Sequence, residues 1–261
     1  MSMLVNWDRI DKTRLLVPIW THGLAIYFLY SFQWWYLIPF VLVNYLMNTT
    51  LSIFLHKTLA HRLWSYNSKI VDHMFAFVSA INFFGGPIQW ALMHRLHHKY
   101  TDGHEDPHAP TIVGSIVSHM HLWKVPPVDI KRKIKIRDLF RDYKHLMIYF
   151  KYPNLTSIAA WTVVGLLFGL EGLAIVGAAS CWQLHTLGII DNWTHSKGNQ
   201  IVQNPSRWGT IAIMGSPEAI EHKEHHEKPW VYSHIKGWFD YHARIMELLA
   251  KRGWVKIHVV K

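Results

Sequence analysis

The sequence has almost no cysteine, since Cys181 is the only one among 261 residues. A single cysteine offers neither a disulfide framework nor a thiolate metal site. Charged residues are also scarce, at 17% of the chain, and no haem or flavin motif is present. These shortages exclude a disulfide-stabilised scaffold and a protein that carries its own iron–sulfur, haem or flavin electron carrier.

Positive charge and histidine are in excess. The net charge is +10, and there are 20 histidines, of which about half are expected to be ordinary surface residues. A charge of this size favours either a nucleic-acid-binding protein or a membrane protein with cationic cytoplasmic loops. Long apolar segments decide for the membrane protein, and no nucleic-acid partner is expected.

Four apolar segments are candidate transmembrane helices, at residues 15–32, 34–55, 155–170 and 173–190. A helix needs about 20 apolar residues to cross a bilayer, so the first pair passes comfortably and the second narrowly. For the second pair, a buried hairpin is the alternative. No signal peptide precedes the first segment, because charged residues are followed by no small-residue cleavage site.

The links between the segments set the topology. Ser31–Gln33 and Glu171-Gly172 are short enough to be hairpin turns, and every Lys and Arg lies outside the two hairpins. By the positive-inside rule, both termini and the stretches 56–154 and 191–261 face the cytoplasm. The sequence therefore predicts a single all-α membrane domain over 1–261: four spans in two hairpins, with a cytosolic helical cap.

Two further stretches are predicted to lie near the membrane surface. Ile70 to Met93 is apolar but interrupted by polar residues and by Gly85-Gly86-Pro87, which favours interfacial helices over a span. Lys124 to Lys151 is basic, and we interpret it as a solvated helix attracted to anionic lipid head groups. The alternative is a docking face for an acidic electron-transfer protein.

The histidines that carry chemistry follow the spans. His56 and His61 follow the second span, and His195 follows the fourth by about one turn. Two H-x-x-H-H motifs stand in the cap, one of His94, His97 and His98 and the other of His222, His225 and His226. On a helix, positions i, i+3 and i+4 share a face, so each motif presents its imidazoles together.

The number of histidines predicts two metal ions. Eight or nine imidazoles exceed the shell of one ion, and a closed structural zinc site needs four ligands. His56 and His61 diverge by about 140° on an α-helix, which suits two neighbouring metals, or an unwound turn, better than one metal. We therefore expect a dinuclear centre at the cytoplasmic membrane surface.

These motifs resemble the membrane fatty acid desaturase family. Trp90 to His108 (WALMHRLHHKYTDGHEDPH) is similar to the family's second histidine box and its Asp-Pro-His tail, and the similarity extends over roughly residues 56–230. The resemblance implies a cytosolic two-iron centre above a membrane helix bundle, with a narrow tunnel for an acyl chain. The metal ligands it implies are His56, His61, His94, His97, His98, His195, His222, His225 and His226.

Three features depart from the family pattern. Residues 60–65 resemble the first box of animal desaturases, but the second histidine would then fall on Tyr66, so the bacterial-like His56/His61 register is preferred. Asp191 stands where the family usually has an asparagine, and its carboxylate is a candidate metal ligand, direct or through water. The third box lacks a Gly-Glu lead-in and carries the extra carboxylates Glu221 and Glu224.

The implied reaction is O2-dependent oxidation of a long acyl chain bound to CoA, lipid or a carrier protein, most readily desaturation in fatty acid biosynthesis. Electrons have to come from an external donor such as ferredoxin or cytochrome b5. Asp102 and Asp106 are candidates to orient imidazoles through their second ring nitrogen, with loop capping as the alternative.

Two other functions remain open. A hydroxylase or other lipid oxidase would use the same scaffold and differ only in its product. A non-enzymatic metal-binding or transport protein would need polar residues inside the spans, where His22, His185 and Glu171 are the candidates.

Overall fold

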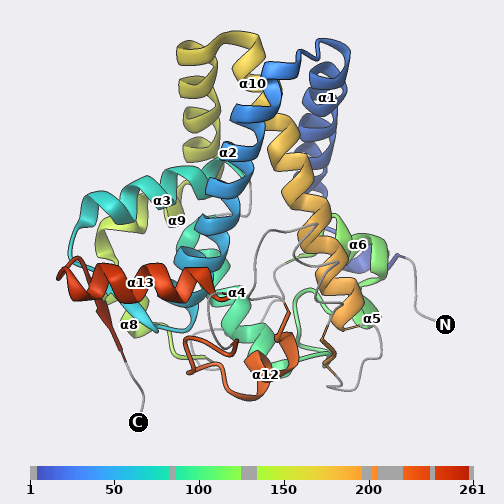
Figure 1. Ribbon diagram of the computed structural model, residues 1–261. Helices are drawn as coiled ribbons and strands as arrows, with labels where there is room; N and C mark the ends of the chain where they lie inside the picture. The colour runs from blue at the N-terminus through green and yellow to red at the C-terminus, as the bar shows by residue number, and fades with distance from the viewer. Residues whose placement is uncertain are drawn as a thin grey trace.

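The structure is a computed structural model that describes residues 5–82, 86–124, 134–195, 202–204, 220–235 and 239–258. It is a helix bundle standing on a compact helical base (Figure 1). The bundle consists of α1 (Leu16–Tyr30), α2 (Leu37–Thr49) with its π-helical continuation η4 (Thr50–Ala60), and α10 (Pro153–Thr194).

Helix α10 contains a reversal within its bounds. Gly169 has φ 65° and ψ −160°, a conformation that side-chain-bearing residues avoid, and the chain turns back there. The predicted second pair of spans is therefore a hairpin, but its turn begins two residues before Glu171-Gly172. The other predicted turn, Ser31–Gln33, separates α1 from η3 (Trp34–Tyr36).

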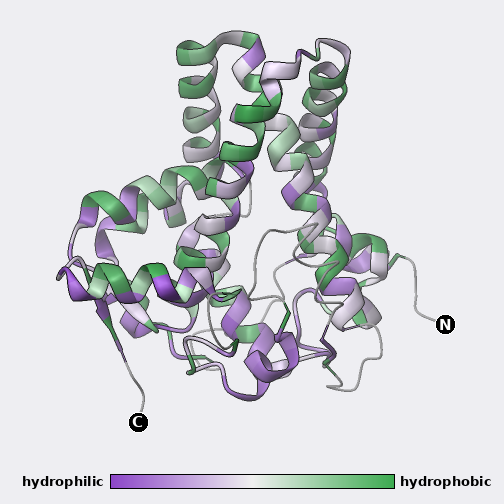
Figure 2. Ribbon diagram, viewed as in Figure 1, coloured by the Kyte–Doolittle hydropathy of each residue, from purple (hydrophilic) through white to green (hydrophobic). Residues whose placement is uncertain are grey.

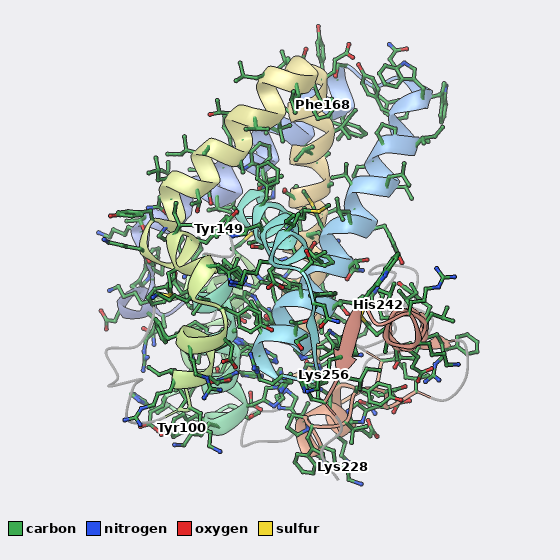
Figure 3. All side chains as sticks on the ribbon, turned by 90° about the vertical axis from the view of Figure 1, so that its left-hand side faces the viewer. Tyr100, Tyr149, Phe168, Lys228, His242 and Lys256 are labelled. Atoms are coloured by element: carbon green, nitrogen blue, oxygen red, sulfur yellow. The ribbon has the colours of Figure 1, made fainter. Side chains whose placement is uncertain are left out.

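Among the described residues, two helices are long and apolar enough to cross a membrane, Trp34–Ala60 and Pro153–Thr194. Helix α1, at 15 residues, is shorter than either. The bundle carries large apolar side chains on its surface, among them Leu29, Leu166 and Phe168, each at least 65% exposed. Figure 2 shows that apolar residues dominate the bundle whereas the opposite end is hydrophilic, and Phe168 marks the bundle's tip in Figure 3. This distribution suits a bundle surrounded by lipid.

The base contains α3 (Lys69–Ile81), α4 (Pro87–Tyr100) and the amphipathic α13 (Tyr241–Lys251). The break between α3 and α4 agrees with the predicted interruption at Gly85-Gly86-Pro87, of which Gly85 lies outside the described residues. Strands β1 (Trp64–Tyr66) and β2 (Val255–Ile257) pair antiparallel, with Trp64 opposite Ile257.

The predicted basic helix is not continuous. Its residues 125–133 lie outside the described part, and the remainder forms α8 (Arg137–Asp142), η5 (Lys144–Leu146) and α9 (Met147–Lys151). The remaining short elements are η1 (Trp7–Arg9), η2 (Lys12–Leu15), α5 (Pro110–Val113), α6 (Ser115–His119) and α12 (His222–Glu227).

Close packing of α10 against α6 depends on Gly188. A Cβ at this position would meet the backbone oxygen and Cα of His119, which cannot rotate away. We expect Gly188→Ala to destabilise the fold by roughly 1–3 kcal/mol, as overpacking does in cores. The measurement is the melting temperature of the detergent-solubilised protein.

Gly23→Ala is the matched control, because a Cβ on Gly23 in α1 meets nothing within 4 Å. Because alanine has a higher helix propensity than glycine, this variant should be as stable as the unmodified protein or more stable by up to about 1 kcal/mol. Equal melting temperatures for the two variants would contradict the packing argument.

Candidate metal centre

The π-helix η4 determines how the first histidine pair lies. In a π-helix each backbone N–H bonds to the residue five positions earlier, and the N–H of His61 donates to the carbonyl of His56 at 3.0 Å. Residues five apart therefore share a face, and the two rings are 4.8 Å apart between centroids. Because His56 and His61 fall in one group of imidazoles, the structure favours the second alternative, a locally unwound helix, over a pair divided between two metals.

Each H-x-x-H-H motif divides between two groups of imidazoles. His94 and His98, one α-helical turn apart on α4, join His56 and His61, whereas His97 points elsewhere. On α12, His225 joins the first group, and His222 and His226 lie with His97 and His195. We call these the five-histidine group (His56, His61, His94, His98, His225) and the four-histidine group (His97, His195, His222, His226).

The Nε2 atoms within each group are closely spaced. In the five-histidine group, the distances are 2.9 Å for His56–His225 and 3.0 Å for both His61–His94 and His98–His225. In the four-histidine group they are 3.0 Å for His195–His222 and 3.3 Å for His97–His226. The groups adjoin, because the rings of His98 and His226 stack at 4.2 Å.

This spacing fits a metal shell. Imidazole nitrogen lies about 2.0–2.1 Å from a bound ion such as zinc, so two nitrogens at a right angle are about 3.0 Å apart. Burial, followed by neighbouring imidazoles, lowers the pKa of six of these histidines well below the usual value: His94, His97, His98, His222, His225 and His226. Their rings are neutral at neutral pH, which is the form that binds metal.

Two aspartates support the four-histidine group. Asp106, fully buried, places Oδ2 2.7 Å from Nδ1 of His97. Oδ1 of Asp102 lies 3.2 Å from Nδ1 of His195, at ion-pair distance but outside hydrogen-bond geometry. Asp102 also holds a positive φ of 58°, a strained conformation that is typical of functional sites. In this geometry each aspartate faces the ring nitrogen that Nε2 ligation would leave free.

Arg95, between the histidines of α4, fixes the end of η4. Its guanidinium donates to the carbonyls of Leu59 and Ala60 at 2.9 and 2.8 Å, satisfying acceptors that the helix end leaves without intrahelical partners. The same group binds Asp138 with two hydrogen bonds of 2.8 and 2.9 Å. Arg95 thus ties the helix bearing His56 and His61 to the helix bearing His94 and His98.

A largely apolar cavity opens beside both groups. It is lined by His56, His94 and His225 of one, by His97 and His222 of the other, and by Leu51, Trp90, Met93, Leu187 and Ile190. Asn48 and Leu51 continue it toward the bundle. An apolar chain entering this cavity would lie next to both groups.

Sequence reasoning did not assign a role to His108, Trp90 or Trp123. The His108 ring stacks on His97 at 4.3 Å, Trp90 stacks on His94 at 4.9 Å, and Trp123 lies against His108. All three line the cavity. The Asp-Pro-His tail of the second box was the available signal for His108; the tryptophans carried none.

Asp191 also lines the cavity, with its side chain 3.9 Å from Nδ1 of His108. It lies four residues before His195, and its backbone oxygen accepts from the His195 N–H at 3.2 Å. The extra carboxylate Glu224 instead accepts a hydrogen bond of 2.7 Å from Asn204. Of these two acidic departures from the family pattern, only Asp191 faces the cavity.

The fold and site define a histidine-rich helical protein with apolar helices of membrane-spanning length. No protein-family model matches the chain. It is 30% identical over 233 residues to the delta-9 desaturase-like 4 protein of Arabidopsis thaliana, covering 85% of this chain and 75% of that protein. It is 27% identical to the delta-9 desaturase-like 2 protein of the same plant, over 91% and 80% of the two chains.

A third relative is an acyl-CoA 5-desaturase of Anemone leveillei, 26% identical over 96% of this chain and 81% of that protein. Similarity of this extent, together with the histidine motifs, identifies the family. The chain belongs to the membrane fatty acid desaturases.

Asp106 should support metal retention through its contact with His97. We expect Asp106→Asn to weaken metal binding about 10- to 100-fold, as loss of a carboxylate behind a ligating histidine does. The measurement is the metal retained by purified protein across a chelator series. Glu227→Gln, an exposed carboxylate on α12, is the control; identical retention by both variants would show that Asp106 only caps its loop.

Proposed function

We propose that the protein is an O2-dependent membrane desaturase that inserts a double bond into a long acyl chain at a two-iron centre. The observation that carries the proposal is the position of the apolar cavity, which is lined by histidines of both groups. Family membership supports an acyl substrate, because relatives are named acyl-lipid and acyl-CoA desaturases. The finer steps below rest on the geometry and the chemistry of the ligands.

In this proposal the five-histidine group holds one iron and the four-histidine group the other, with Asp191 beside the second as a direct or water-mediated ligand. Imidazole suits iron, and the four-histidine group leaves positions open. When bound, the iron pair would use O2, two external electrons and two protons to remove two hydrogens from adjacent methylenes, giving an alkene and two waters.

The chain's own residues supply positioning. Leu51, Met93 and Ile190 hold the acyl chain and exclude water, so that one pair of methylenes lies beside the histidines. His97, pinned by Asp106, and His195, next to Asp102, keep fixed ring orientations. Electrons come from an external donor such as ferredoxin or cytochrome b5, because the chain has no carrier motif of its own.

The activity is tested by whole-cell lipid analysis after expression. We expect fatty acyl chains that are two hydrogens lighter than their saturated parents, and at least about a 100-fold loss of this product in His225→Ala. His73→Ala is the control, since His73 on α3 lies in neither histidine group and packs against His145 and Tyr149. Products heavier by one oxygen would identify the hydroxylase alternative, and unchanged lipids would reject both.

We also propose that the protein spans the membrane four times with both termini and the histidines in the cytoplasm. The support is the exclusion of every Lys and Arg from the two hairpins. The exposed Glu171 then lies on the opposite side of the membrane from the exposed Lys251 of α13.

This topology is tested with single reactive thiols in a Cys181→Ser background. Glu171→Cys should react with a membrane-impermeant maleimide in intact cells, because it lies in the outer turn. Lys251→Cys should react only after permeabilisation. The reverse pattern would invert the orientation, and protection of both sites in intact cells would favour the buried-hairpin alternative.

A further inference from the structure

A second cluster of metal-ligating side chains lies between α1 and α10, which run side by side (Figure 1). His22 of α1 and His185 of α10 face each other with their Nε2 atoms 3.0 Å apart. Cys181, one helical turn before His185, places its sulfur within 4.8 Å of a ring nitrogen of each histidine. None of these residues belongs to the five-histidine or four-histidine group.

The Pro18 carbonyl fixes the tautomer of one imidazole in this contact. Nδ1 of His22 lies 2.6 Å from the carbonyl oxygen of Pro18, which only accepts, so the ring proton of neutral His22 sits on Nδ1. Its Nε2 therefore presents a lone pair to His185.

At the other end of the cluster, Nδ1 of His185 lies 2.9 Å from Nε2 of His119. When His185 donates through Nδ1 to this nitrogen, its own Nε2 also presents a lone pair. The two Nε2 atoms, 3.0 Å apart, are then arranged as a pair of metal ligands, at the spacing found within the two histidine groups.

Cys181 favours a metal ion over an extra proton between these nitrogens. Its side chain is 92% buried, and no hydrogen bond to its sulfur occurs within the described ranges. A buried imidazolium would lack an anionic partner there, whereas a thiolate bound to a metal supplies one. A single cysteine was expected to offer no thiolate metal site. One thiolate can, however, share a metal ion with imidazole ligands.

We propose that His22, Cys181 and His185 bind a third metal ion, of the zinc or copper(I) class, that links α1 to α10. Thiolate and imidazole together suit these ions. Binding deprotonates the Cys181 thiol and releases one proton to solvent. The Pro18 carbonyl and His119 hold the outer nitrogens of the two imidazoles, as partners of ligating histidines commonly do. This site is independent of the proposed lipid oxidation.

The single cysteine makes the test specific. Cobalt(II) added to the purified, detergent-solubilised protein should give a thiolate-to-cobalt charge-transfer band. The band should reach its maximum when one cobalt ion per chain is bound at this site. Cobalt bound at the two histidine groups cannot contribute, because Cys181 is the only thiol. Cys181→Ser should abolish the band and His22→Gln should weaken it at least tenfold, whereas His73→Gln should leave it unchanged.

Metal analysis of the protein as purified distinguishes the two ions. We expect one zinc or one copper per chain beyond the metal of the histidine groups, lost in Cys181→Ser with iron unchanged. No thiolate band in the unmodified protein with excess cobalt, or a band insensitive to His22→Gln, would overturn the proposal. The proposal would also be overturned if the unmodified protein contained no more zinc or copper than Cys181→Ser. His22, His185 and His119 would then be linked by hydrogen bonds alone.

Discussion

The close approach of imidazole nitrogens is the constraint on which the rest of this structure depends. Nine imidazole rings converge with Nε2 atoms about 3 Å from their neighbours, a spacing that suits a bound cation. No single motif could place them so. The second half of η4, helix α12 and the residue that follows α10 must all reach the face of α4.

Several contacts serve this convergence. The π-turn brings His56 and His61 onto one face, and Arg95 holds that helix end against α4. Asp106 fixes the His97 ring. These restraints come from elements distant in sequence, so the site is rigid only when the whole base is folded. A preformed site of this kind lowers the cost of ordering its ligands when metal binds.

The histidines, the helical class and the apolar segments were predictable because they rest on local composition and spacing. The division of each H-x-x-H-H motif between two groups was not, since positions i, i+3 and i+4 share one broad face and only tertiary packing decides which partner each ring meets. The π-helix over Thr50–Ala60 has no sequence signal that we recognise. The turn at Gly169 was displaced by two residues because the apolar pattern continues through it. His119 could not be singled out from the sequence, because its role depends on its contact with α10.

The second half of α10, residues 170–194, runs without interruption from the turn at Gly169 to the histidine groups, a length of roughly 37 Å. His185 lies on this straight segment and His195 caps its end, so the tilt of the segment affects both the bundle and the four-histidine group. Helices tilt to match the thickness of the surrounding bilayer. In the proposed membrane topology, a change in bilayer thickness that tilts this helix would therefore move the bundle and the histidine at the helix end together.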